Sequence, residues 1–361
     1  KHVAAKETTD ITLFVRTSDE EIDHWDRKRI VDALMLETYV DADTAEAISL
    51  DVERQIMASG LTHLTAPLIR ELVDAKLMER GLEQARSMHT RLGFPLYDVS
   101  QLILHQNKEN ANLPHGPEAS NLILAEGIKK EYALHGVFSP EVGDAHVRGD
   151  IHLHDQGYVD RPYGSSQTLE FVKKFGISLP NTFSASKPAR HAEVLLAHMV
   201  RYSAVLQGYF SGTIGWDAVN VFFAPYLETL PDREIEQIAQ MLVFEFSQLA
   251  VSRGGQAIFT EIGICWEIPR HLRDVPAIGP GGDFTGRTYG DYEKASQRFA
   301  RALFEIYRGG DALGSPFFFP KPLLRITEDF FETPGHEEFL LHVCDAAVQK
   351  GNPPFLFDRN R

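Results

Sequence analysis

The chain has 361 residues, 43% hydrophobic and 24% charged, which is typical of a globular protein of two or three domains. Its formal net charge of -15 argues against a surface that binds the phosphate backbone of nucleic acids, because such surfaces are basic. The sequence has neither an apolar run of about 18 residues, as a membrane span needs, nor an N-terminal signal-peptide core, so we expect a cytoplasmic protein without membrane contact.

Residues 1–95 predict a small domain in which a β-hairpin precedes a bundle of short helices. β-Branched and aromatic residues indicate a strand over 11–16, and 21–25 is the expected return strand. Apolar residues at helical spacing then predict three helices and a short fourth one through Ala85. The expected helix starts and stops are Asp26, Gly60, Thr65 and Gly81.

Residues 96–361 show longer mixed segments. Strand-like runs at 151–153 and 257–268 alternate with amphipathic helices at 189–206 and 233–249. This alternation predicts an α/β fold.

Two histidines and a carboxylate close the segment Gly149-Asp-Ile-His-Leu-His-Asp155. On a strand, His152 and His154 would lie on one face, with Asp155 at its end. Each histidine alone could equally be a hydrogen-bonded structural imidazole. Amidohydrolase-type barrels present metal ligands in this way, so a metal-dependent hydrolase that uses His152 and His154 is an alternative function. That function needs further ligands at later strand ends, which the other histidines do not obviously supply, and we therefore predict no tight metal site.

A polar, glycine-centred loop, Ser252-Arg-Gly-Gly-Gln256, follows the helix predicted at 233–249. Gly254 and Gly255 would let the backbone approach a ligand closely, and their N–H groups could hold a phosphate. Arg253 could add a bidentate phosphate contact, and Gln256 a contact to a base or ribose. A purely structural turn is the alternative.

Glu109-Asn-Ala-Asn112 is a third polar element. The amides of Asn110 and Asn112 offer both donors and acceptors, which suits ribose hydroxyl groups, although turn capping would use the same residues.

Together these segments resemble the catalytic subunit of anaerobic (class III, glycyl-radical) ribonucleoside-triphosphate reductases. The histidine block follows an Ala-His dipeptide, Ala145-His146, and the Gly-Gly-Gln loop precedes Phe259-Thr260, as in that family. The resemblance implies that 96–361 is the first part of a ten-stranded α/β barrel. It also implies that the substrate is positioned by Asn110, Asn112, His152, His154, Asp155, Ser252, Arg253, Gly254, Gly255 and Gln256.

Residues 10–95 resemble the ATP-cone, a regulatory nucleotide-binding module of many ribonucleotide reductases. Trp25-Asp-Arg-Lys-Arg-Ile30 keeps one motif of that module with arginine in place of lysine, whereas the hairpin turn, Arg16-Thr-Ser-Asp19, departs from the usual Lys-Arg-Asp-Gly. The resemblance implies binding of ATP or dATP as effectors. A solvated, charged helix face is the alternative. The expected contacts are Arg16, Asp26, Arg29 and Arg70.

The family's chemistry implies the other partners. A radical S-adenosylmethionine activating enzyme generates a glycyl radical, which passes to a cysteine that removes the ribose 3′ hydrogen, with formate or a thiol as reductant. The substrates are ribonucleoside triphosphates, and the enzyme is a homodimer or larger oligomer. The finger loop, the glycyl radical domain and its zinc site are expected beyond Arg361. A stand-alone nucleotide-sensing module without catalysis is a further alternative.

Cys265 and Cys344 are the two cysteines of the chain, which excludes a disulfide scaffold or an all-cysteine metal site within it. Many family members have an active-site cysteine shortly after the histidine block, but 159–166 contains none. Cys265 alternates with Ile264 and Trp266 on a strand, and Cys344 shares a predicted helix with Leu340 and Leu341, so both look like packing residues. We therefore assign no catalytic residue within the chain.

Overall fold

The computed structural model describes most of the chain, in six stretches: 14–16, 22–61, 63–105, 115–178, 184–249 and 256–358. The chain divides into two compact units, 1–98 with 125–157 and 99–124 with 158–361. The sequence predicts a domain boundary near residue 95, and the first compact unit contains 125–157 in addition to the N-terminal residues. Among the described residues, no helix has both the length and the apolar character that crossing a bilayer requires.

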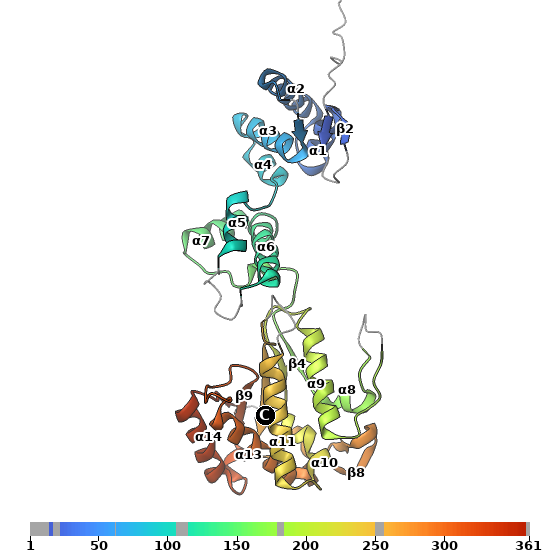
Figure 1. Ribbon diagram of the computed structural model, residues 1–361, viewed down its shortest axis with the longest axis vertical. Coiled ribbons are helices and arrows are strands. Elements are labelled where there is room, and N and C mark those ends of the chain that lie inside the picture. Colours follow the sequence, from blue (N-terminus) through green and yellow to red (C-terminus); the bar gives the residue numbers. More distant parts are fainter. Residues whose placement is uncertain are drawn as a thin grey trace, which may run out of the picture. The chain divides into compact units, whose positions relative to one another are not determined.

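The N-terminal unit begins, in blue in Figure 1, with a three-stranded sheet in the order β2-β1-β3. β1 (Phe14–Arg16) pairs antiparallel with β2 (Ile22–His24), which confirms the predicted hairpin, and β3 (His63–Thr65) runs parallel to β1. Four helices follow the predicted periodicity: α1 (Lys28–Glu37), α2 (Ala42–Ser59), α3 (Ala66–Glu79) and α4 (Glu83–His89).

Local signals explain where these helices begin and end. Asp41 caps α2 by accepting from the N–H of Thr44, and Gly60 ends it with φ +67°, a left-handed conformation that glycine adopts freely. Thr65 caps α3. Asp26 lies one residue farther from α1 than expected, yet its carboxylate accepts from the N–H of Lys28 at 2.9 Å. The buried core of the bundle includes Leu34, Ile48, Val52, Leu64 and Leu77.

The chain continues through α5 (Leu96–Leu104), α6 (Pro117–Tyr132), a π-helical turn η1 (Ala133–Val137) and α7 (Pro140–Arg148). The strand predicted at 151–153 is wrong, because this segment is a loop that closes the end of α7. Gly149 caps the helix with φ +83°, the N–H of Asp150 bonds back to Ala145, and that of Leu153 bonds to Nδ1 of His146. These backbone donors are therefore not available for a sheet.

The second unit contains a five-stranded sheet in the order β10-β9-β6-β5-β4, and every pair of neighbours is parallel. Helices connect its strands, so the predicted α/β class is confirmed. The strands are β4 (Ser165–Gln167), β5 (Ile214–Trp216), β6 (Thr260–Cys265), β9 (Lys321–Ile326) and β10 (Phe355–Phe357). The longer helices are α8 (Leu169–Phe175), α9 (Ala192–Leu206), α10 (Val219–Leu227), α11 (Asp232–Gln248), α13 (Glu293–Gly309) and α14 (His336–Lys350).

Smaller elements lie between or beside these helices. They are η2 (Gln156–Tyr158), α12 (Arg270–Arg273), the antiparallel pair β7 (Pro276–Ile278) and β8 (Phe284–Thr288), and the 3₁₀ turns η4 (Pro280–Gly282), η5 (Tyr289–Tyr292) and η6 (Asp329–Glu332).

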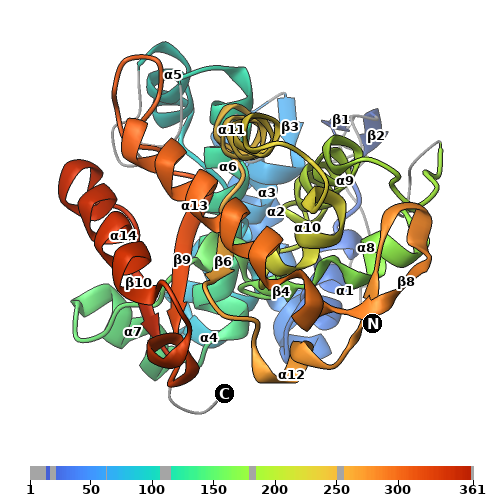
Figure 2. The same cartoon turned by 90° about the horizontal axis from the view of Figure 1, so that it is seen from below.

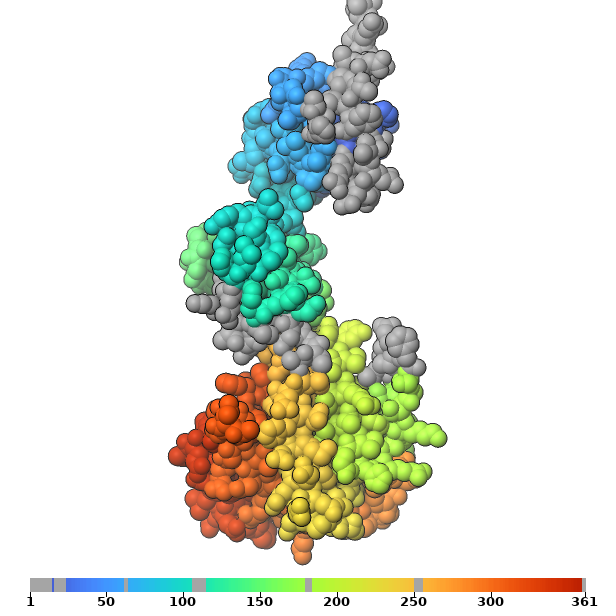
Figure 3. All heavy atoms as spheres, viewed as in Figure 1, coloured from blue at the N-terminus to red at the C-terminus, as the bar shows by residue number. Residues whose placement is uncertain are grey.

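One face of the five-stranded sheet is covered by helices. α10 and α13 both pack on β6, and α13 lies between α10 and α14 (Figure 2). On the face of this unit seen in Figure 3 lie, among others, α9 in yellow-green, α11 in yellow and α14 in red. The buried residues of this layer include the aliphatic side chains of Ile262, Ile264 and Leu324 on the strands and the aromatic side chains of Trp216 and Phe222.

The other face of the sheet carries a different kind of residue. On β6, Glu261 and Gly263 alternate with the buried isoleucines, and on β9 Leu323 and Arg325 alternate with buried Leu324 and Ile326. Glycine, carboxylate and guanidinium groups therefore face away from the helical layer. We call this face the polar face of the sheet.

Candidate functional site at the carboxyl ends of the strands

Four charged side chains lie where parallel strands end. Asp217 follows β5, Glu267 lies two residues beyond β6, Arg325 is near the end of β9, and Asp358 follows β10. Because the strands are parallel, these ends meet at one edge, where open α/β sheets bind their ligands.

Arg325, on β9, pairs with one carboxylate that follows β5 and another that follows β10. Its Nη2 lies 2.9 Å from Oδ1 of Asp217, and its Nη1 donates to Oδ2 of Asp358 at 3.2 Å. Each of the three side chains is less than one fifth exposed, at 18%, 17% and 18%. Partial burial weakens the screening of these pairs by water, so they fix β5, β9 and β10 to one another.

Two neighbours hold this arrangement in place. A Cβ atom on Gly263 would lie 3.1 Å from Oδ1 of Asp217, so the absence of a side chain there lets the carboxylate lie against β6. Asn220, at the start of α10, donates to the carbonyl of Cys265 at 2.7 Å and accepts from its N–H at 3.1 Å. The end of β6 is therefore hydrogen-bonded to the helix layer.

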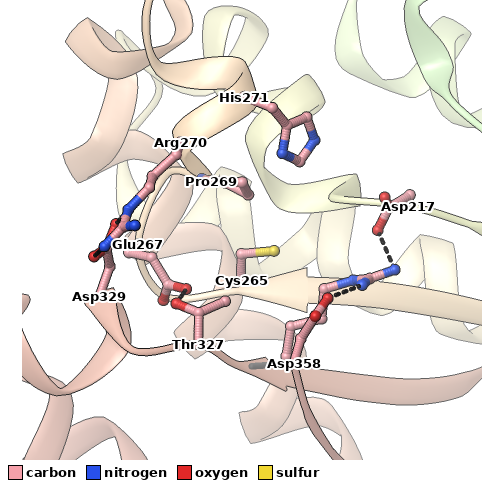
Figure 4. A pocket seen from close by; sticks show the side chains of 10 residues that line it. Asp217, Cys265, Glu267, Pro269, Arg270, His271, Thr327, Asp329 and Asp358 are labelled. Carbon is pink, nitrogen blue, oxygen red and sulfur yellow. Dashed lines mark hydrogen bonds and ion pairs between the residues drawn. The ribbon is translucent and has the colours of Figure 1, made fainter. Parts of the chain in front are cut away.

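Two hollows adjoin this edge, and both are lined by Asp217 and Arg325. The first lies on the polar face and is also lined by Ser165, Ser166, Gly215 and Glu261, among others. The second lies beyond the strand ends (Figure 4). Its other lining residues are Cys265, Glu267, Pro269, Arg270, His271, Thr327, Asp329 and Asp358.

The second hollow has two buried acidic groups. Burial raises the pKa of the Cys265 thiol far above its usual range, and the nearby Asp217 carboxylate adds to this effect. Burial also raises the pKa of the Glu267 carboxyl. The hydrogen bond that it accepts from Thr327 lowers this pKa, but by less. Burial thus favours the protonated form of the thiol, and Cys265 lies in the core, which fits the packing position that the sequence predicts.

The histidine block forms a cluster in the N-terminal unit, although it is not a strand. The rings of His146 and His152 are 5.8 Å apart, and those of His152 and His154 are 5.7 Å apart. His154 Nδ1 lies 3.5 Å from His152 Nε2, and its Nε2 lies 3.5 Å from Oδ1 of Asp155. Asp155 has φ +51°, a left-handed conformation that few non-glycine residues adopt. The two histidines therefore meet through a loop rather than through strand alternation.

Several predicted site residues lie outside the described part of the chain: Asn110, Asn112, Ser252, Arg253, Gly254 and Gly255. Gln256 is described, and it is buried with 4% of its surface exposed. Among the residues that the structure describes, no three His, Cys, Asp or Glu side chains are arranged to hold a metal ion.

The predicted nucleotide contacts of the N-terminal unit differ in their surroundings. Asp26 and Arg29 are exposed at the start of α1, whereas the side chain of Arg16 lies outside the described residues. Arg70 binds both oxygens of Glu37, at 2.7 and 2.9 Å, and also the carbonyl of His89. This pairing lowers the pKa of the Glu37 carboxyl, so a phosphate would compete with a carboxylate for Arg70.

The sequence profile described as anaerobic ribonucleoside-triphosphate reductase matches residues 109–361, more than half of the chain. The chain belongs to this family. Membership confirms the predicted family resemblance over these residues. No curated protein sequence matches the chain at a significant level.

Solved structures of anaerobic ribonucleotide reductases are similar to this chain at low sequence identity. The anaerobic ribonucleotide reductase of Thermotoga maritima with MES in its active site has a TM-score of 0.54 and 17% identity, over 77% of this chain and 48% of that one. The same organism's reductase in complex with dATP and CTP has a TM-score of 0.48 and 17% identity, over 65% and 42%. This chain thus spans about half the length of the reductases that it matches.

The charged residues at the strand ends were not among the predicted site residues of this reductase-family chain. A signal was present, because Asp217, Arg325 and Asp358 each interrupt or directly follow an apolar strand segment. What the sequence lacked was the strand order that brings them together.

Proposed function

We propose that this chain is the N-terminal part of an anaerobic reductase that converts ribonucleoside triphosphates into deoxyribonucleoside triphosphates. The observation that carries the proposal is the family match over 109–361, the region that contains the polar face and its charged edge. Hydroxyl-rich, charged substrates suit a pocket lined by hydroxyl, carboxylate and guanidinium groups. A cytoplasmic location fits such substrates.

Substrate positioning is the role we assign to this chain. The proposed contacts are the predicted set, namely Asn110, Asn112, His152, His154, Asp155, Ser252, Arg253, Gly254, Gly255 and Gln256, together with the polar face. Arg325 would orient Asp217 toward the ligand rather than bind phosphate, because both of its Nη atoms already face carboxylates.

The radical groups themselves are proposed to lie outside this chain. When present, the glycyl radical supplies the hydrogen-abstracting power, after activation by a radical S-adenosylmethionine enzyme and with formate or a thiol as reductant. Cys265 does not suit a thiyl site, because its thiol is 1% exposed at the end of a strand. Assembly as a homodimer or larger oligomer, and a zinc site in a C-terminal part, are expectations from the family.

We further propose that residues 1–95 form an ATP-cone that binds ATP or dATP, ahead of barrel residues 96–361. The hairpin, the four helices and the exposed Arg29 support this proposal. Calorimetric titration of the whole chain with ATP and dATP tests it, since Arg29→Ala should weaken binding by about 1.5–3 kcal/mol if Arg29 donates a charge-assisted hydrogen bond. Arg54→Ala is a control on another exposed arginine. Absence of heat with both nucleotides at millimolar concentration would rule the module out.

Turnover by the full-length protein tests the main proposal and distinguishes it from a stand-alone nucleotide sensor. After anaerobic activation, it should convert CTP to dCTP, measured by chromatography, with the radical quantified by electron paramagnetic resonance. A full radical signal without any deoxynucleotide product would contradict the reductase assignment.

A further inference from the structure

Glu267 is a carboxyl group that the proposed reaction does not yet use. It lies at the end of β6, two residues after Cys265, and 1% of its surface is exposed. Trp266, between them, points the other way and stacks on Phe339 with ring centroids 4.3 Å apart. The alternation therefore directs Glu267 into the hollow beyond the strand ends (Figure 4).

The two oxygens of Glu267 have different environments. Oε1 accepts a hydrogen bond from the hydroxyl of Thr327 at 2.6 Å. Oε2 is buried and has no hydrogen-bond partner among the described residues. A buried polar atom without a partner costs free energy, which a ligand in the adjoining hollow would recover.

The basic side chains around the hollow are already paired with aspartates. Arg325 faces Asp217 and Asp358, and Arg270 donates to both oxygens of Asp329, which Arg273 also approaches at 3.7 Å. Glu267 has no ion pair among the described residues. A buried carboxyl without a cationic partner binds a proton instead of keeping its charge.

The hollow therefore offers donors to a neutral ligand. A protonated Glu267 has one O–H to donate, and Nε of Arg325 is buried without a partner among the described residues. Asp217 and Asp358 supply accepting oxygens nearby. A hydroxyl group both accepts and donates, and adjacent hydroxyl groups could satisfy several of these atoms together.

We propose that Glu267 is uncharged in the folded protein and donates a hydrogen bond to a single hydroxyl oxygen that a neutral ligand group inserts into this hollow. Within the proposed function, on which this identification of the ligand rests, that group is the ribose of the nucleotide. Glu267 is then a positioning group for a sugar, and not a base.

Infrared spectroscopy of the whole chain at neutral pH tests the protonation. The carbonyl stretch of a protonated carboxylic acid should be present, move in D₂O, and disappear in Glu267→Gln. Glu228→Gln is the matched control, because Glu228 is exposed and paired with Arg287. Thr327→Val leaves Glu267 in place and should shift the band to higher frequency, which assigns the band even if Glu267→Gln does not fold. Absence of such a band overturns the proposal.

Titration with D-ribose and with CTP tests the ligand. The band should shift to lower frequency with either probe. Glu267→Leu should raise the Kd about fivefold to tenfold, whereas Glu267→Gln, which keeps a neutral donor, should bind nearly as the wild type. A band that neither probe moves would overturn the ligand assignment. A response to D-ribose in a protein whose full-length form makes no deoxynucleotide would support this site and reject the reductase function.

Discussion

The guanidinium of Arg325 lies 2.9 Å from the carboxylate of Asp217, so the end of β9 is joined to the end of β5 across the intervening strand β6. A second contact, to Asp358, extends the link to β10. One arginine thus holds two carboxylates from segments that are more than a hundred residues apart in sequence. The stability of the sheet edge should depend on it.

Arg325→Met should lower the free energy of unfolding by about 3 kcal/mol, because it leaves two poorly exposed carboxylates without their cation. Urea unfolding followed by circular dichroism measures the change. Arg270→Met is the matched control: this arginine also pairs with an aspartate but is 62% exposed, so its loss should be hard to distinguish from wild type. Equal effects of the two substitutions would show that the Asp217–Arg325–Asp358 link is not structural.

Gly263→Ala should disturb the same carboxylate by steric contact alone. The new Cβ would lie 3.1 Å from Oδ1 of Asp217, and the displacement should cost about 1–3 kcal/mol of stability. Gly215→Ala, on the adjacent strand, places its Cβ 3.7 Å from the nearest atom and should be tolerated. Urea midpoints compare the two variants, and a stable Gly263→Ala would mean that Asp217 can move without cost.

The sequence was sufficient where local pattern decides structure. Helical spacing predicted α9 and α11 to within a few residues, and the alternation around Ile262 and Ile264 predicted β6. At 151–153 the same alternation wrongly predicted a strand. There the cap of α7 and the ring of His146 take the backbone donors that a strand would need.

The charged edge could not be predicted, because it depends on strand order. Cys265 lies beside Arg325 because of the register between β6 and β9, and β9 lies next to β6 because of the chain crossover. Both depend on interactions of the whole sheet and not on local sequence. A single aspartate after an apolar run, such as Asp217, is compatible with many surface turns until its partner strand is known. The burial of Glu267 could not be predicted either, because it follows from the packing of the folded chain around its side chain.

Lys173 should make stability rise with pH. It is fully buried, donates to the carbonyl of Phe222 at 2.7 Å and to the hydroxyl of Tyr289 at 3.2 Å, and lies 4.8 Å from the centre of the Tyr289 ring. Burial lowers its pKa well below 10.5, with a smaller opposing effect from Glu170. Between the folded pKa and 10.5 the unfolded chain binds more protons, so raising the pH through this window favours the folded state.

Lys173→Met should abolish that pH dependence. Urea titration at several pH values measures the unfolding free energy of both proteins. As pH rises, the wild type should become more stable relative to the variant. Lys174→Met is the control, because Lys174 is only partly buried. A difference that is flat across alkaline pH would show that Lys173 does not titrate abnormally.

The double substitution Cys265→Ser and Cys344→Ser should preserve deoxynucleotide formation in the activated full-length protein. Cys265 is a buried thiol with a strongly raised pKa, and Cys344 lies in α14. Cys265 ends a strand and Cys344 lies within a helix, so neither is at a loop tip, where we expect the radical-accepting thiol. Loss of turnover with the glycyl radical signal intact and the fold unchanged would place the catalytic thiol in this chain.

Hydrogen–deuterium exchange of the full-length protein with and without CTP measures directly which face of the five-stranded sheet the nucleotide contacts. Peptides covering 213–220, 260–269 and 321–328, which contain Asp217, Glu267 and Arg325, should exchange more slowly when CTP is bound. ATP alone serves as the control for effector binding elsewhere. Protection confined to the outer helices α11 and α14, with these three peptides unchanged, would contradict a substrate site on the polar face of the sheet.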